Sequence, residues 1–149
     1  MADKREISEY YAELAKEVIE ENNELAYLRD AEITIIYLES QHKKKSHKKI
    51  VFAECEKVAE KNKWAVPCDF TITVFLPNVE RRNFTEEQKK IVLFHELLHI
   101  GVDFEGNWFI RPHDLEDFKL IIDKFGTDWA QGRAKEEDHA DAADQEEVV

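Results

Sequence analysis

The feature that most constrains this chain is a segment with helical periodicity, residues 85–101, that carries two histidines and a glutamate among apolar side chains. Thr85 and Gln88 have the spacing of a capping box, in which each side chain bonds the backbone N–H of the other. Apolar residues lie on nearly every side of the helical wheel: Ile91, Leu93, Phe94, Leu97, Leu98 and Ile100. Gly101 follows, and glycine is the residue type best suited to the position after a helix. We therefore predict a buried central helix that ends near Ile100.

Inside this helix, His95 and His99 are four residues apart, so their imidazoles lie on the same side and can reach one metal ion. Glu96 is about 100° further round the helix, close enough to hold a metal-bound water without being a ligand. Two buried imidazoles and a buried carboxylate are costly without partners, and a bound cation would satisfy all three. The pentapeptide 95–99 therefore predicts a metal site.

A catalytic zinc ion typically has three protein ligands and one open position. Seven residues after His99 could supply the third ligand: Asp103, Glu105, His113, Asp114, Glu116, Asp117 and His139. We predict His113, because a turn signal at residues 105–107 suggests a short hairpin or an extended return, which would bring the chain back to the site. Asp114 and Asp117 could orient an imidazole by accepting its second N–H, or could bind the metal themselves. Both would also be explained as acidic residues at the start of a helix.

The rest of the chain suggests an α+β domain. Residues 4–28 have the apolar spacing of an amphipathic helix, and residues 112–126 have that of a last helix. Strands are expected at residues 31–38, 50–55 and 69–76, with a short helix or turn at 56–63 and a polar connection at 77–83. Segment 31–38 is apolar on both faces, as a central strand would be. We expect a sheet of three or four strands packed against the N-terminal, buried and C-terminal helices.

Length and charge limit the classes of function. We expect one domain over residues 1–131 and a disordered acidic tail over 132–149, where seven acidic residues face two basic ones. The formal net charge of −12 argues against general binding to nucleic acids or anionic membranes. No apolar run approaches the roughly 18 residues of a membrane span, and no signal peptide is apparent, so a cytoplasmic location is expected. Cys55 and Cys68 are expected to be reduced thiols.

One basic segment stands out in this acidic chain. His42–Lys49 holds five lysines and two histidines in eight residues. A solvated loop between two strands would explain it without any function. The alternative is that the Lys43–Lys49 loop contacts an acidic partner or substrate.

Two blocks of the sequence carry a family resemblance. Residues 88–101, which contain HELLH, and residues 111–118, which contain HDLEDF, resemble the putative phage metallopeptidase family. The similarity extends from about Ala31 to Trp129. It implies a small zincin-like, SprT-like α+β domain encoded by phages or prophages. By this resemblance His95, His99 and His113 would bind zinc, and Glu96 would be the catalytic glutamate.

The resulting hypothesis is a zinc-dependent peptidase that acts on a protein or peptide. Zinc would polarise the scissile carbonyl and acidify its water, and Glu96 would take the water proton and deliver it to the leaving amine. Two alternatives stay open, because they use the same metal site. One is a metal-stabilised module that binds a host protein without turnover, and the other is a zinc hydrolase of an amide that is not a peptide.

Overall fold

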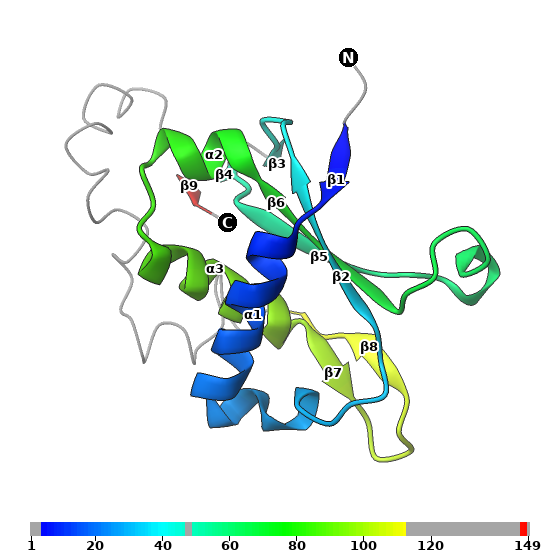
Figure 1. Ribbon diagram of the computed structural model, residues 1–149. Helices are drawn as coiled ribbons and strands as arrows, with labels where there is room; N and C mark the ends of the chain where they lie inside the picture. Colours follow the sequence, from blue (N-terminus) through cyan, green and yellow to red (C-terminus); the bar gives the residue numbers. More distant parts are fainter. Residues whose placement is uncertain (1–3, 47–48, 113–146, 149) are drawn as a thin grey trace.

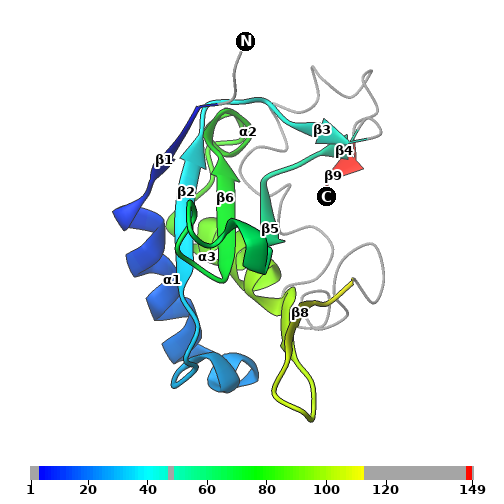
Figure 2. The same cartoon turned by 90° about the vertical axis from the view of Figure 1, so that its right-hand side faces the viewer.

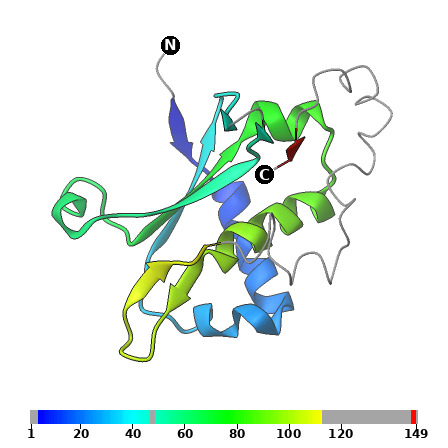
Figure 3. The ribbon, with the colours of Figure 1, turned by 180° about the vertical axis from the view of Figure 1, so that it is seen from behind.

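A four-stranded sheet with two helices on one of its faces forms the centre of the protein (Figures 1 and 3). The computed structural model describes residues 4–46, 49–112 and 147–148. The strands lie in the order β1 (Arg5–Ile7), β2 (Ile35–Ser40), β6 (Phe70–Phe75) and β5 (Ala53–Lys57). The helices on the sheet are α1 (Glu9–Glu21) and α3 (Glu86–Leu98). This arrangement confirms the predicted α+β class, whereas the predicted C-terminal helix lies outside the described residues.

Shorter elements complete the described part of the chain. They are η1 (Asn23–Leu28), β3 (Lys45–Ser46), β4 (Lys49–Ile50), η2 (Glu60–Asn62), α2 (Leu76–Arg81), β7 (Ile100–Val102), β8 (Trp108–Ile110) and β9 (Glu147–Val148). β7 and β8 form a hairpin, one of the two arrangements that the turn signal predicted, with Gly106 at a φ of 86° in its tip. No helix in the described part is long and apolar enough to cross a membrane.

The strand register places the hydrophobic core on the helix side of the sheet. Tyr37, Ile72 and Cys55 are neighbours across β2, β6 and β5, and they share that face. Because side chains alternate along a strand, Thr73 points to the opposite face. There its hydroxyl accepts a 2.9 Å hydrogen bond from Arg5 in β1. β2 lies between β1 and β6, so the prediction of a central strand from its apolar residues is confirmed.

The single helix predicted for residues 4–28 is wrong at both ends. Residues Arg5–Ile7 form β1, which pairs antiparallel with β2. Ser8 then starts α1, where its hydroxyl accepts from the Tyr11 N–H at 3.1 Å. Asn22 ends the helix in an extended conformation, and a 3₁₀ helix follows. Ile7 fits the helical period by chance, because it lies on the open face of the sheet with 72% of its surface exposed.

The connection predicted for residues 77–83 is also different, because residues 76–81 form the helix α2. Pro77 is compatible with a helix here because the first turn does not use its missing N–H. Asn78 is buried, and its side-chain amide donates to the carbonyl oxygens of Val51 at 2.7 Å and Lys44 at 3.0 Å. This polar residue therefore joins α2 to the basic segment at Lys44 and to Val51, just after the segment.

The other predicted helices and strands differ from the observed ones by a few residues at their ends. The strand predicted at 50–55 becomes β4 and β5, while the strands predicted at 31–38 and 69–76 become β2 and β6. The short helix or turn expected at 56–63 is represented by η2. Of the predicted acidic tail the structure describes only β9, which pairs parallel with β4.

Candidate metal centre

Helix α3 carries the pentapeptide, and its start is held as the sequence predicts. The Thr85 hydroxyl accepts from the Gln88 N–H at 3.2 Å, and the Gln88 side chain accepts from the Thr85 N–H at 2.8 Å. Leu93 and Leu97 have no exposed surface and Phe94 has 1%, so the helix is buried in the core. The helix that presents the histidines is therefore fixed by a cap at one end and by core packing along its length.

Removing the cap should destabilise the protein. We expect Thr85→Ala to lower the free energy of unfolding by about 1 kcal/mol, because the Gln88 N–H loses its acceptor. Urea denaturation would measure the change. Thr85→Ser, which keeps the hydroxyl, is the control and should lose much less. Equal losses in the two variants would contradict the role given to the capping box.

His95, Glu96 and His99 come together at the C-terminal end of α3, as the spacing predicts. The imidazole centroids of His95 and His99 are 5.3 Å apart. Two imidazoles that ligate one tetrahedral zinc ion through nitrogens at about 2.0–2.1 Å place their centroids about 5 Å apart. His95 and Glu96 are 7% and 5% exposed, and the Glu96 carboxylate is 3.9 Å from Nε2 of His95. The spacing of the two rings therefore fits a shared metal ion.

The orientation of His99 is fixed from outside the helix. Its Nδ1 is 2.7 Å from the backbone carbonyl oxygen of Arg111. A carbonyl oxygen can only accept, so Nδ1 carries the hydrogen, and in the neutral ring Nε2 is then the nitrogen that could bind a metal. Sequence reasoning gave Arg111 no role, and no local pattern could have done so, because the contact joins residues 12 positions apart.

The end of α3 differs from the prediction. The helix ends at Leu98 with His99 as its cap, so Gly101 does not occupy the position after the helix. Gly101 is instead paired with Phe109 across the β7–β8 hairpin. A Cβ on Gly101 would lie 2.7 Å from the Phe109 ring, closer than any contact allows. A side chain at this position would therefore have to displace the Phe109 ring, and no left-handed backbone is involved.

The described residues offer no third metal ligand beside the two histidines. Within residues 4–46, 49–112 and 147–148, no three His, Cys, Asp or Glu side chains are grouped so that they could hold a metal ion. Asp103 is used by the hairpin, since its Oδ1 accepts from the N–H groups of Glu105 at 2.9 Å and Asn107 at 2.8 Å. The predicted ligand His113 and its neighbours Asp114 and Asp117 lie outside the described residues, so their roles stay predictions.

The thiol of Cys55 lies on the face of the sheet that α3 covers. Burial raises the pKa of Cys55 far above its usual range, and the negative charges of Glu96 and Glu56 raise it further. Cys55 is therefore a neutral thiol near physiological pH. Cys55 and Cys68 are both free of disulfide bonds, as the sequence predicts.

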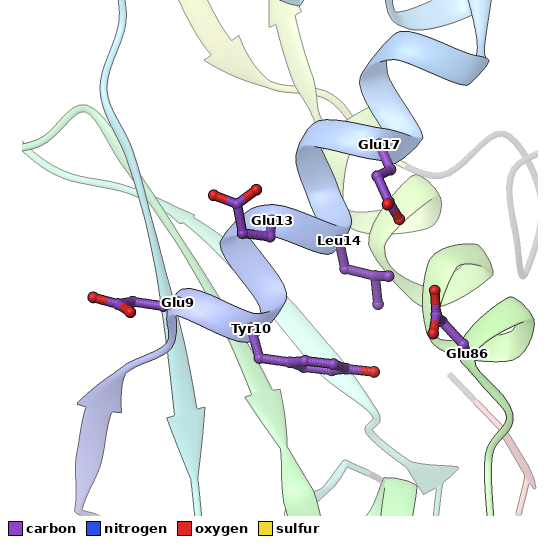
Figure 4. Close-up of a pocket in the computed structure, with 6 residues that line it drawn as sticks. All are labelled: Glu9, Tyr10, Glu13, Leu14, Glu17 and Glu86. Carbon is purple, nitrogen blue, oxygen red and sulfur yellow. The ribbon is translucent and has the colours of Figure 1, made fainter.

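A separate pocket of about 390 Å³ lies between α1 and the start of α3 (Figure 4). It is lined by Glu9, Tyr10, Glu13, Leu14, Glu17 and Glu86. Glu86 precedes His95 by nine residues, which is about 14 Å along a helix. The pocket is therefore at the other end of α3 from the histidines and is not part of the candidate metal centre.

The basic segment is partly engaged within the protein. Lys44 forms an ion pair with Glu54, and its ammonium is 5.6 Å from the centroid of the Phe75 ring. The side chains of Lys43 and Lys45 are exposed. The prediction of an acidic partner at the Lys43–Lys49 loop stays a prediction.

Comparison with known proteins supports a family assignment. No curated protein and no solved structure matches the chain. A family model described as putative phage metallopeptidase matches residues 3–137. The match covers most of the chain, including the pentapeptide and His113, and its description implies a metal cofactor and a hydrolase. The chain belongs to the putative phage metallopeptidase family.

Proposed function

We propose that this protein is a zinc-dependent peptidase whose catalytic base is Glu96. The observation that carries the proposal is the pair of imidazoles, His95 and His99, held 5.3 Å apart beside a buried carboxylate. Neutral imidazoles are common zinc ligands, and a carboxylate beside them is placed to act on a water molecule. The proposed ligands are His95, His99 and His113, with Asp114 and Asp117 as candidates for orienting an imidazole.

The chemistry divides between the metal and the chain. When bound, zinc supplies Lewis-acid chemistry that polarises a peptide carbonyl and acidifies a water molecule. Glu96 takes the water proton and later delivers it to the leaving amine. Glu96 is only 5% exposed, so solvent screens its carboxylate weakly and its electrostatic interactions with a nearby cation are stronger than at the surface.

Metal removal tests this function. Chelation should abolish cleavage of an unfolded protein such as casein, and addition of zinc should restore it. The melting temperature should also rise with zinc, because a ligand that binds only the folded state at 1,000 times its Kd stabilises it by about 4 kcal/mol. Mass spectrometry of the peptides and a thermal shift assay would measure the two effects.

Two single substitutions, one at a proposed ligand and one at a histidine outside the site, provide matched variants. His99→Ala should lose both zinc binding and cleavage, since it removes one of the two described imidazoles of the proposed metal site. His42→Ala, which removes an exposed histidine of the basic segment, should keep both. Zinc binding without cleavage of any peptide would contradict the peptidase proposal and favour a metal-stabilised binding module.

A further inference from the structure

We propose that Arg111 is a positioning residue for the metal centre, holding His99 in the tautomer and orientation that present Nε2 to the metal. This inference rests on the proposed function, since it concerns the same site. Arg111 follows β8 and is half-buried beside the end of α3. Figure 2 shows β8 next to the C-terminal end of that helix.

The first argument is that one residue makes three hydrogen bonds to two consecutive residues of the helix end. The Arg111 N–H donates to the His99 carbonyl at 2.6 Å. The Arg111 carbonyl accepts from Nδ1 of His99 at 2.7 Å. The guanidinium Nε donates to the Leu98 carbonyl at 2.9 Å. The backbone and the imidazole of His99 are thus tied to the same residue, which limits rotation of the ring.

The second argument concerns the charge and the free carbonyls at the end of α3. The last carbonyls of a helix have no partner within it, and the helix end carries a partial negative charge. The guanidinium of Arg111 satisfies the Leu98 carbonyl and brings a positive charge to this end. The side chain of Arg111 therefore holds its own backbone carbonyl at the position where the imidazole needs it.

The third argument is that Tyr27 contacts both strands of the β7–β8 hairpin. Tyr27 donates its hydroxyl to the Ile100 carbonyl at 2.5 Å and stacks on Trp108, with ring centroids 6.4 Å apart. Burial raises the pKa of Tyr27, so the hydroxyl keeps the proton that it donates. β8 is thereby held against the end of α3 immediately before Arg111. His113, the proposed third ligand, is only two residues further along the chain.

The test uses Arg111→Met, which removes the guanidinium but keeps an aliphatic side chain. We expect its Kd for zinc, measured by competition with a chelating dye, to rise about 10- to 100-fold, as for other partners that orient a metal ligand. In the metal-free protein, ¹⁵N–¹H correlations of the imidazole should show mainly the Nδ1–H tautomer of His99 in the parent. Both tautomers should appear in the variant.

Arg29→Met is the matched control. Arg29 donates its Nε to the Ile19 carbonyl and a terminal nitrogen to the Glu20 carbonyl at the end of α1, both at 3.1 Å. The control removes the same kind of helix-end contact far from the pentapeptide in sequence, so it should leave zinc affinity and the His99 tautomer unchanged. Arg111→Lys, which keeps a donor and a positive charge, should lie closer to the parent than Arg111→Met does.

Three results would overturn the proposal. They are parent-like zinc affinity and tautomer in Arg111→Met, equal losses in Arg29→Met, and equal losses in Arg111→Lys and Arg111→Met. If the parent protein bound no zinc, the proposed function would fail on its own. The tautomer of His99 in the metal-free proteins would then still decide whether Arg111 positions the ring.

Discussion

Replacing Glu96 with glutamine is expected to lower kcat for peptide cleavage about 10²- to 10⁴-fold, the range typical of a lost general base. The amide has nearly the same shape but cannot accept the water proton. His95 and His99 are unchanged, so zinc should remain bound at its parent stoichiometry. Peptide cleavage under saturating substrate and metal analysis of the same preparation would measure both effects.

The control for this variant is Glu86→Gln. Glu86 lies in the first turn of the same helix, is exposed, and should leave kcat unchanged. Full activity in Glu96→Gln would exclude Glu96 as the base. Loss of both zinc and activity would instead give Glu96 a structural role in the metal centre.

Replacing Leu97 with alanine is expected to lower the free energy of unfolding by about 2–5 kcal/mol, the range for a large-to-small change in a core. Leu97 has no exposed surface and lies between His95 and His99 in the sequence. The cavity would loosen the contact between α3 and the sheet, so zinc affinity should fall as well. Urea denaturation of the metal-free protein and zinc competition would measure the two losses.

Glu87→Ala, an exposed substitution on the same helix, is the comparison and should cost less than about 1 kcal/mol. A Leu97→Ala protein as stable as the Glu87→Ala protein would contradict the buried position of α3. Parent-like zinc affinity despite the expected loss of stability would mean that the histidines do not depend on the packing of this helix.

Helix α3 shows which structural features can be predicted from residue spacing within one segment. Its capping box, its apolar pattern and its histidine spacing each depend on residues only a few positions apart in the sequence. The regular geometry of a helix fixes where such residues lie relative to one another. The cap at Thr85, the burial of Leu93 and Leu97, and the approach of His95 to His99 were therefore all predictable.

The N-terminal segment shows why other predictions failed. Ile7 fits a helical period, but pairing with β2 gives residues 5–7 hydrogen bonds that no local pattern reports. Gly101 looked like a residue that ends a helix, yet it pairs with Phe109 across the hairpin, and the Phe109 ring fills the space where its side chain would be. In both cases the partner lies elsewhere in the chain, and periodicity carries no information about it.

The sequence by itself determined the α+β class, the buried helix and the two imidazoles on one side of it, because these depend on the regular geometry of a helix and on the burial of apolar side chains. Only the tertiary structure decided which nitrogen of His99 carries the hydrogen. That choice depends on the carbonyl of Arg111, which the β7–β8 hairpin returns to within 2.7 Å of the ring. A hydrogen bond between distant residues requires the folded chain to bring donor and acceptor together.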